Sequence, residues 1–180
     1  MIRRLLIALA AVALLLTAFA SLTAGAPPQM FVTPLNSDEE TAPATGMSHA
    51  RGVAVFQLNE AGTELSYQLI ASNIDNVFMA HIHFSAPPGS TAGIVVWLFP
   101  STTPNVTGPL GSGPHDGVLA TGTIHATDLV GVLAGQPMSA LVDALRSGNA
   151  YVNVHTNDGV DGVNTGPGDF PGGEIRGQID

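Results

Sequence analysis

Six polar residues have side chains that could do chemistry together, although they lie in three short segments far apart in the sequence. They are His81 and His83 in segment 80–83, Asn153 and His155 in segment 151–156, and Glu174 and Arg176 in segment 172–179. Neutral imidazole is a ligand for copper and for zinc, so the three histidines could hold one ion. Glu174 could orient one ring through its second nitrogen or complete the ligand shell.

A hydrogen-bonded network is the alternative interpretation of the same six residues. Polar groups inside a domain must find partners, and these six could satisfy one another and the nearby backbone. Arg176 favours the network, because a guanidinium on the same face lowers the affinity for a second cation unless Glu174 neutralises it. The residue types therefore leave a structural network and a metal site both open.

Each of the three segments alternates polar and apolar residues with the period of a β-strand. The apolar residues that fall on the opposite face are Ile82, Val152, Val154, Ile175 and Ile179. Two histidines at i and i+2 on a strand lie about 6 to 7 Å apart at their Cα atoms, which suits two ligands of one ion. The pattern predicts adjacent strands with one polar and one apolar face.

A second group of candidate ligands lies in the acidic, glycine-rich stretch 157–169. Asp158, Asp161 and Asp169 offer oxygen atoms of the kind that calcium prefers, although their spacing does not match the loop of an EF-hand. The same stretch also fits a flexible, solvated loop. The remaining polar groups of interest are expected at the surface: the acidic run 38–40, His49, His115 and His125.

No catalytic arrangement is recognisable, and no catalytic residue is assigned. The serines lack a nucleophile-elbow pattern, and the glycine-rich stretches are not followed by the helix of a phosphate-binding loop. The chain has no cysteine, which excludes thiol nucleophiles and thiolate metal ligands. The sequence favours a protein that is not an enzyme, and copper or zinc are the cofactors it allows.

The N-terminus has the layout of a secretory signal peptide. Arg3 and Arg4 precede an apolar run from Leu5 to Ala20 that ends in small residues. The run is shorter than the roughly 20 residues that span a bilayer. We therefore expect residues 1–20 to be a cleaved signal peptide, with no membrane anchor left afterwards and a secreted or periplasmic location.

The charge of the mature chain argues against two kinds of partner. Removing residues 1–20 takes away two of the five basic residues and none of the 14 acidic ones, which leaves a formal charge of −11. The three remaining arginines are dispersed, and there is no lysine. Nucleic acid and anionic lipid are not expected partners, because both would be repelled.

The rest of the chain predicts many short strands. Residues 21–46 form an extended segment with an expected edge strand at 29–33, and 51–58 and 65–70 form a hairpin around a turn. Further strands are expected at 77–84, 94–99 and 118–124, with a loop over 100–117. Pro137 and Gly148 bound one helix. The fold class is all-β: an antiparallel Greek-key β-sandwich or barrel with one short helix.

Four blocks of this chain resemble the CHRD domain, first described in chordin and also found in bacterial secreted proteins. The blocks are 52–54 with 65–67, 80–83, 148–156 and 171–178. The resemblance begins near residue 30 and reaches the end, and we assign 47–180 as the CHRD domain. In this chain, residues 157–170 lengthen the connection between the histidine strand and the Pro-Gly-Gly-Glu turn.

The resemblance implies a secreted, β-rich module without an assigned catalytic activity. We therefore expect a non-catalytic protein with a structural or protein-binding role outside the cytoplasm, whose partner is an extracellular protein of unknown identity. A copper- or zinc-binding protein that uses His81, His83 and His155 is the alternative.

Overall fold

Strands make up most of the regular structure, as the alternating pattern predicts. The computed structural model describes residues 29–84, 87–160 and 166–180. Its strands are β1 (Met30–Asn36), β2 (Arg51–Leu58), β3 (Leu65–Asp75), β4 (Val77–Phe84), β5 (Gly93–Phe99), β6 (Pro114–Ile124), β7 (Ala150–Thr156) and β8 (Ile175–Ile179). Three short 3₁₀ helices and one α-helix complete the described part: η1 (Ser37–Glu39), η2 (Ala126–Asp128), η3 (Gly131–Leu133) and α2 (Met138–Arg146).

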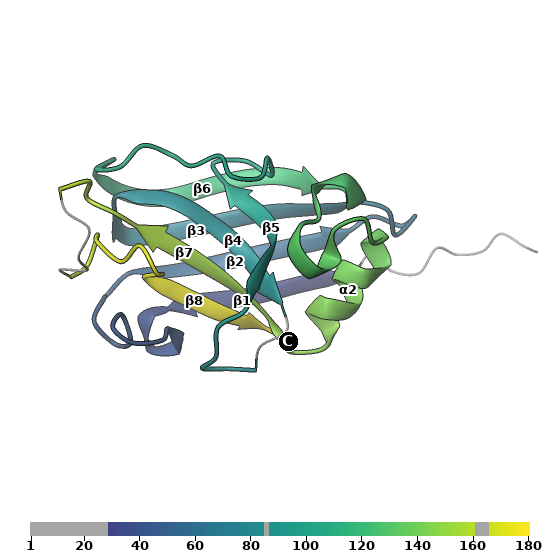
Figure 1. The fold of residues 1–180 in the computed structure, drawn as a ribbon, viewed down its shortest axis with the longest axis horizontal. Helices are drawn as coiled ribbons and strands as arrows, with labels where there is room; N and C mark the ends of the chain where they lie inside the picture. The colour runs from purple at the N-terminus through teal and green to yellow at the C-terminus, as the bar shows by residue number, and fades with distance from the viewer. Residues whose placement is uncertain (1–28, 85–86, 161–165) are drawn as a thin grey trace, which may run out of the picture.

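The strands form one antiparallel sheet that folds over on itself. Its order is β5-β4-β7-β8-β1-β2-β3-β6, so strands close in sequence are often separated in the sheet. Figure 1 shows β5, β4, β7 and β8 in front of β1, β2 and β3. Hydrogen bonds connect β5 with the other layer and with the connection after β6: Tyr67 Oη on β3 donates to Leu98 O on β5 (2.6 Å, buried), and Val130 N donates to Val95 O on β5 (2.9 Å). The predicted all-β antiparallel sandwich or barrel is confirmed.

Two of the expected strands differ from the structure. The first strand is found, but β1 is not at an edge, because it pairs with β2 along its whole length and with β8 at Asn36. Phe31 and Leu35 on this strand point into the core. The strand expected at 118–124 begins earlier, since β6 starts at Pro114, inside the expected loop. Proline is tolerated there because β6 is an edge strand, where a missing backbone N–H costs little.

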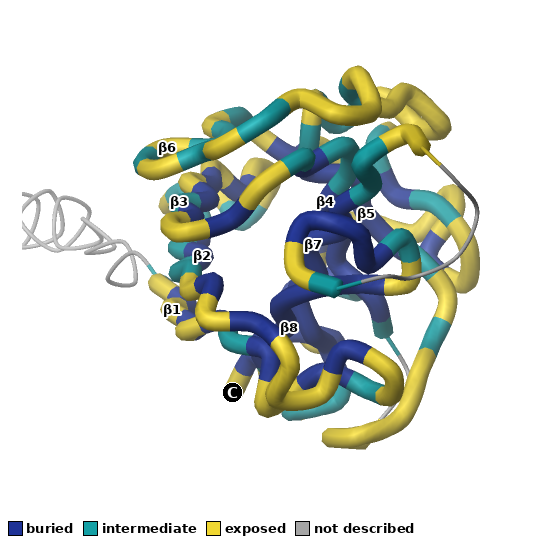
Figure 2. Tube along the Cα trace, turned by 90° about the vertical axis from the view of Figure 1, so that its left-hand side faces the viewer, coloured by how far each residue is buried: buried dark blue, intermediate teal, exposed yellow. Residues whose placement is uncertain are grey.

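The apolar core lies between the two layers and is closed at one end by α2. This helix buries Met138, Leu141, Val142 and Leu145, which recur at helical spacing. Strand β7 is buried on both faces along its whole length (Figure 2). One face of β7 meets the core, so its polar face must be covered by other parts of the chain.

Gly177 on β8 lies against the backbone of β1 with no room for a side chain. A Cβ atom built at this position would overlap the carbonyl oxygen of Pro34 and lie 2.9 Å from Thr33 Oγ1. Glycine is therefore required there by space. A Cβ atom built at Gly172, five residues earlier, has no other atom within 4 Å.

We expect Gly177→Ala to lower the free energy of unfolding by about 1–3 kcal/mol, because β8 must move away from β1 to make room. Chemical denaturation of the purified protein measures the change, with Gly172→Ala as the matched control. Equal destabilisation by the two substitutions would contradict the close approach of these strands.

Candidate metal centre

The polar residues of β4, β7 and β8 form one layer on the face turned away from the core. Register places His81 opposite Asn153, and Asn153 opposite Arg176, across three neighbouring strands. His83 lies opposite Tyr151 in the same way. The predicted alternation is thus correct, and it brings five of the six expected site residues side by side. We call this set, together with Tyr151, the polar layer.

Three histidines of the polar layer converge. One ligand nitrogen from each of His81, His83 and His155 can be chosen so that all three lie within 4.8 Å of one another. All three side chains are buried, with exposed fractions of 0%, 9% and 6%. His81 Nδ1 lies 3.2 Å from His155 Nε2. Two nitrogen ligands of one tetrahedral ion, each at about 2.0–2.1 Å from it, are separated by a similar distance of roughly 3.3 Å.

Backbone carbonyls fix the protons of two rings. His83 Nδ1 lies 2.9 Å from Ala92 O, and His155 Nδ1 lies 2.9 Å from Pro171 O. A carbonyl oxygen can only accept, so each Nδ1 carries the hydrogen and each Nε2 keeps its lone pair. The lone pair of His155 Nε2 faces His81 Nδ1, whereas His83 Nε2 has no hydrogen-bond partner. This is the arrangement by which metal-binding histidines are oriented through their second nitrogen.

The imidazoles are held neutral by their surroundings. Burial lowers the pKa of His81 to about 2 and that of His155 to about 4, and the neighbouring imidazoles act in the same direction. Burial also lowers the pKa of His83. Metal ligation by histidine requires the neutral ring, so no proton has to be displaced near pH 7.

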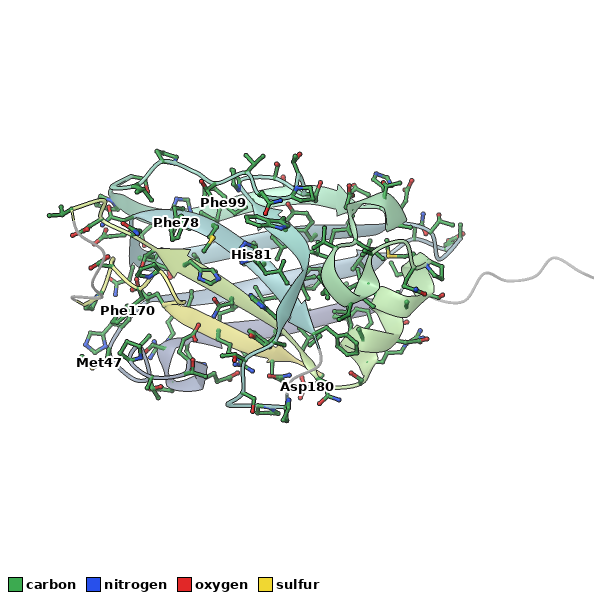
Figure 3. All side chains as sticks on the ribbon, in the orientation of Figure 1. Met47, Phe78, His81, Phe99, Phe170 and Asp180 are labelled. Carbon is green, nitrogen blue, oxygen red and sulfur yellow. The ribbon has the colours of Figure 1, made fainter. Side chains whose placement is uncertain are left out.

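Aromatic rings surround the histidines. Trp97 meets His81 edge to face, with ring centroids 4.2 Å apart, and Tyr151 stacks on His83 at 4.7 Å. Phe78 lies edge-on to His155 at 6.4 Å. Figure 3 labels Phe78, His81 and Phe99, all in the upper half of the molecule, near β4 and β5. The rings exclude water, which strengthens electrostatic interactions inside the cluster.

Arg176 joins the polar layer through Tyr151 rather than through an acidic partner. Its guanidinium carbon lies 3.5 Å from the centroid of the Tyr151 ring, a cation–π contact. Its Nη1 donates to Ser90 O (2.6 Å) and its Nη2 to Gln178 Oε1 (3.1 Å). Glu174 forms no ion pair with Arg176 among the described residues, so the condition under which it would neutralise this cation is not met.

Glu174 holds the loops around the site instead of touching the histidines. Its carboxylate accepts hydrogen bonds from Ser48 Oγ (2.6 Å), Thr156 Oγ1 (2.6 Å) and the backbone N–H of Gly168 (2.8 Å). The role proposed for Glu174 from the sequence, orienting an imidazole, belongs to the carbonyls of Ala92 and Pro171. Strict alternation would place Glu174 on the same face as Arg176. Glu174 lies before β8 begins, however, and its side chain does not share that face.

Glu40 is a member of the site that sequence analysis missed. It was expected in a solvated acidic run, but only 6% of it is exposed, and Oε1 accepts a hydrogen bond from Asn153 Nδ2. Burial raises the pKa of Glu40 from 4.5 to about 7, although Thr41 N–H, Arg176 and Asn153 all favour the charged form. Its neighbours Asp38 and Glu39 are exposed, as expected. Nothing in the local sequence distinguishes Glu40, because its partners come from β7 and β8.

The other candidate residues lie away from the histidines. Asp158 is partly buried and accepts a hydrogen bond from Val160 N, Asp169 is buried near Glu174, and Asp161 lies outside the described residues. The calcium interpretation stays a prediction. His49 and His125 are exposed, as expected, and His115 is partly buried.

The fold and the site define an all-β antiparallel domain with a buried, neutral three-histidine cluster on one outer face. The family model for the CHRD domain matches residues 31–179, nearly the whole chain. The chain therefore belongs to the CHRD domain family, whose members are typically extracellular and of a protein-binding type. Comparisons with curated proteins and with solved structures find no match. Within residues 29–84, 87–160 and 166–180, no helix combines the length and hydropathy needed to cross a membrane.

The buried Glu40 generates a pH prediction. Because its pKa is higher in the folded protein, folding takes up a proton, and the free energy of unfolding falls as pH rises from about 4.5 to about 7. The fall from this group is at most about 3 kcal/mol. Glu40→Gln cannot ionise, so this part of the pH dependence should vanish.

Denaturation of the metal-free protein at several pH values from 4.5 to 8 measures this difference. The exposed Glu60→Gln serves as control, since all other titrating groups are common to the three proteins. If the free energy of unfolding of Glu40→Gln depended on pH as strongly as that of the wild-type protein, Glu40 would not be buried as described.

Proposed function

We propose that this chain is an exported, non-catalytic CHRD module that holds one copper or zinc ion between His81, His83 and His155. The observation that supports the ion most directly is the hydrogen bonding of the three rings. Loop carbonyls use Nδ1 of His83 and His155, and His81 Nδ1 meets His155 Nε2. Nε2 of His81 and Nε2 of His83 are then buried without a hydrogen-bond partner.

These two nitrogens weaken the network interpretation. Unpartnered polar atoms in a buried network cost free energy, and a half-satisfied network is less stable than an apolar cluster of the same shape. A Lewis acid is the group that bare imidazole lone pairs bind best. The neutral rings, the carbonyls that orient them and the closed aromatic surroundings all favour an ion.

The ion fits a structural role better than a catalytic one. A catalytic metal keeps an open position for water or substrate, whereas the three histidines are at most 9% exposed and enclosed by Trp97, Tyr151 and Phe78. The module would then present its loops and sheet to an extracellular protein. The formal charge of −11 on residues 21–180 favours protein partners over nucleic acid and anionic membranes.

Metal content tests the centre. Residues 21–180, exported natively and purified without a histidine tag, should carry about one equivalent of copper or zinc per chain. The double variant His81→Ala/His83→Ala should carry none, because one imidazole cannot hold the ion, while the exposed His49→Ala should match wild type. Elemental analysis by inductively coupled plasma mass spectrometry measures all three.

A second measurement separates the metal from a network. The melting temperature of the wild-type protein should rise on adding the metal and fall on chelation, because the ion binds the folded state. The double variant should show neither response. Absence of metal from the wild-type protein, with no shift on metal addition, would leave the hydrogen-bonded network as the function of the histidines.

Export has its own test. Expression of the full chain should yield a processed protein whose N-terminal residue is Ser21, because the leader pattern ends at Ala20. Mass spectrometry of the protein recovered outside the cytoplasm measures this, and replacing Leu14 and Leu15 by arginine should keep it inside. Recovery of the unprocessed chain in the cytoplasm would contradict export.

A further inference from the structure

The ligands of the proposed centre carry no negative charge. Among the described residues, the group that can hold a metal consists of three histidines and no carboxylate. The two buried glutamates around the polar layer have other partners. Glu174 is bound by Ser48, Thr156 and Gly168, and Glu40 by Asn153 and Thr41. Three imidazoles therefore leave the whole charge of the ion uncompensated.

A fixed cation lies beside the cluster. The guanidinium of Arg176 is buried, with 1% of the residue exposed, and contacts Tyr151, whose ring stacks on His83. Arg176 forms no ion pair with a carboxylate among the described residues, and Glu40, the acidic group on which it acts, offsets its charge only in part, because burial raises the pKa of Glu40 to about 7. A buried dication next to this group would be costly. A monovalent ion halves the repulsion and lowers the desolvation cost still more, because that cost grows with the square of the charge.

Met79 is placed to supply a fourth ligand. It is the cross-strand partner of His155 on β7, so the two side chains project from the same face of the sheet. Met79 is also two residues before His81 on β4, which puts it in line with both β4 histidines. A thioether is neutral, soft and flexible, and among first-row metals it selects Cu(I).

We propose that the centre selects Cu(I) over Zn(II), with Met79 as a ligand that determines this specificity. This inference rests on the proposed metal centre and deepens it. Neutral ligands, a nearby buried cation and a soft sulfur donor all discriminate in the same direction. A zinc centre would instead gain from a carboxylate in place of the methionine and from the absence of Arg176.

Competition titrations test the selectivity. Under anaerobic, reducing conditions, Cu(I) is titrated into residues 21–180 against bathocuproine disulfonate, and Zn(II) against a chromophoric zinc chelator. Quenching of Trp97, the only tryptophan, reports binding independently, because its ring contacts His81. The wild-type protein should bind Cu(I) at least about a hundredfold more tightly than Zn(II).

Met79→Leu keeps the volume of the side chain but removes the sulfur. It should weaken the affinity for Cu(I) by about tenfold or more and change the affinity for Zn(II) by no more than about twofold. Met47→Leu is the matched control, since this methionine is 59% exposed. X-ray absorption at the copper edge should show a sulfur neighbour in wild type and none in Met79→Leu. The melting temperature of the metal-free variant verifies that it is folded.

The outcomes separate the two proposals. A wild-type protein that binds neither ion removes the metal centre itself. A protein that binds Zn(II) as tightly as Cu(I), or a Met79→Leu variant that matches Met47→Leu in Cu(I) affinity and copper spectrum, keeps the centre but overturns the Cu(I) specificity.

Discussion

The hydrogen bonds to the buried Glu174 carboxylate hold together the parts of the chain that cover the polar layer. Ser48 belongs to the segment after η1, Thr156 ends β7, and Gly168 lies in the long connection to β8. A carboxylate at 1% exposure without these donors would carry the full cost of desolvation. Three donors offset that cost, and each is correctly placed only when its own segment is folded. The carboxylate therefore makes the two loops and the strand cooperative with one another.

Burial of β7 on both faces explains the electrostatics of the site. An antiparallel strand usually has one face in water, where histidine and glutamate would show ordinary protonation. Here loops cover that face, so His81 and His155 are kept neutral and Glu40 titrates near pH 7. An aromatic face, a carbonyl oxygen and an amide oxygen surround the guanidinium of Arg176. One covered strand thus produces neutral imidazoles beside a fixed cation.

Sequence patterning predicted what depends on local periodicity. The strands, the helix 138–146 and the sharing of one face by His81, His83, Asn153, His155 and Arg176 follow from periods of 2 and 3.6 residues. It did not predict what depends on loops folding back. Glu40 is buried because the segment that follows η1 packs over Asn153 of β7. Glu174 does not lie on the same face as Arg176, because the regular strand begins only after it. The interior position of β1 also lay beyond patterning, because an alternating strand looks the same at an edge and in the middle of a sheet.

The loops and the histidines depend on each other. His83 is oriented by Ala92 O and His155 by Pro171 O, and both carbonyls lie on connections outside the strands. Pro171 lies three residues before Glu174, so the carboxylate that anchors this connection also positions the carbonyl that fixes the His155 tautomer. An ion that requires those tautomers favours the conformation in which both loops are docked, and docked loops present the ligands at low cost in entropy. In the proposed centre, ion binding and the docking of these loops are therefore coupled, and an enclosed ion would influence the surface offered to a proposed partner.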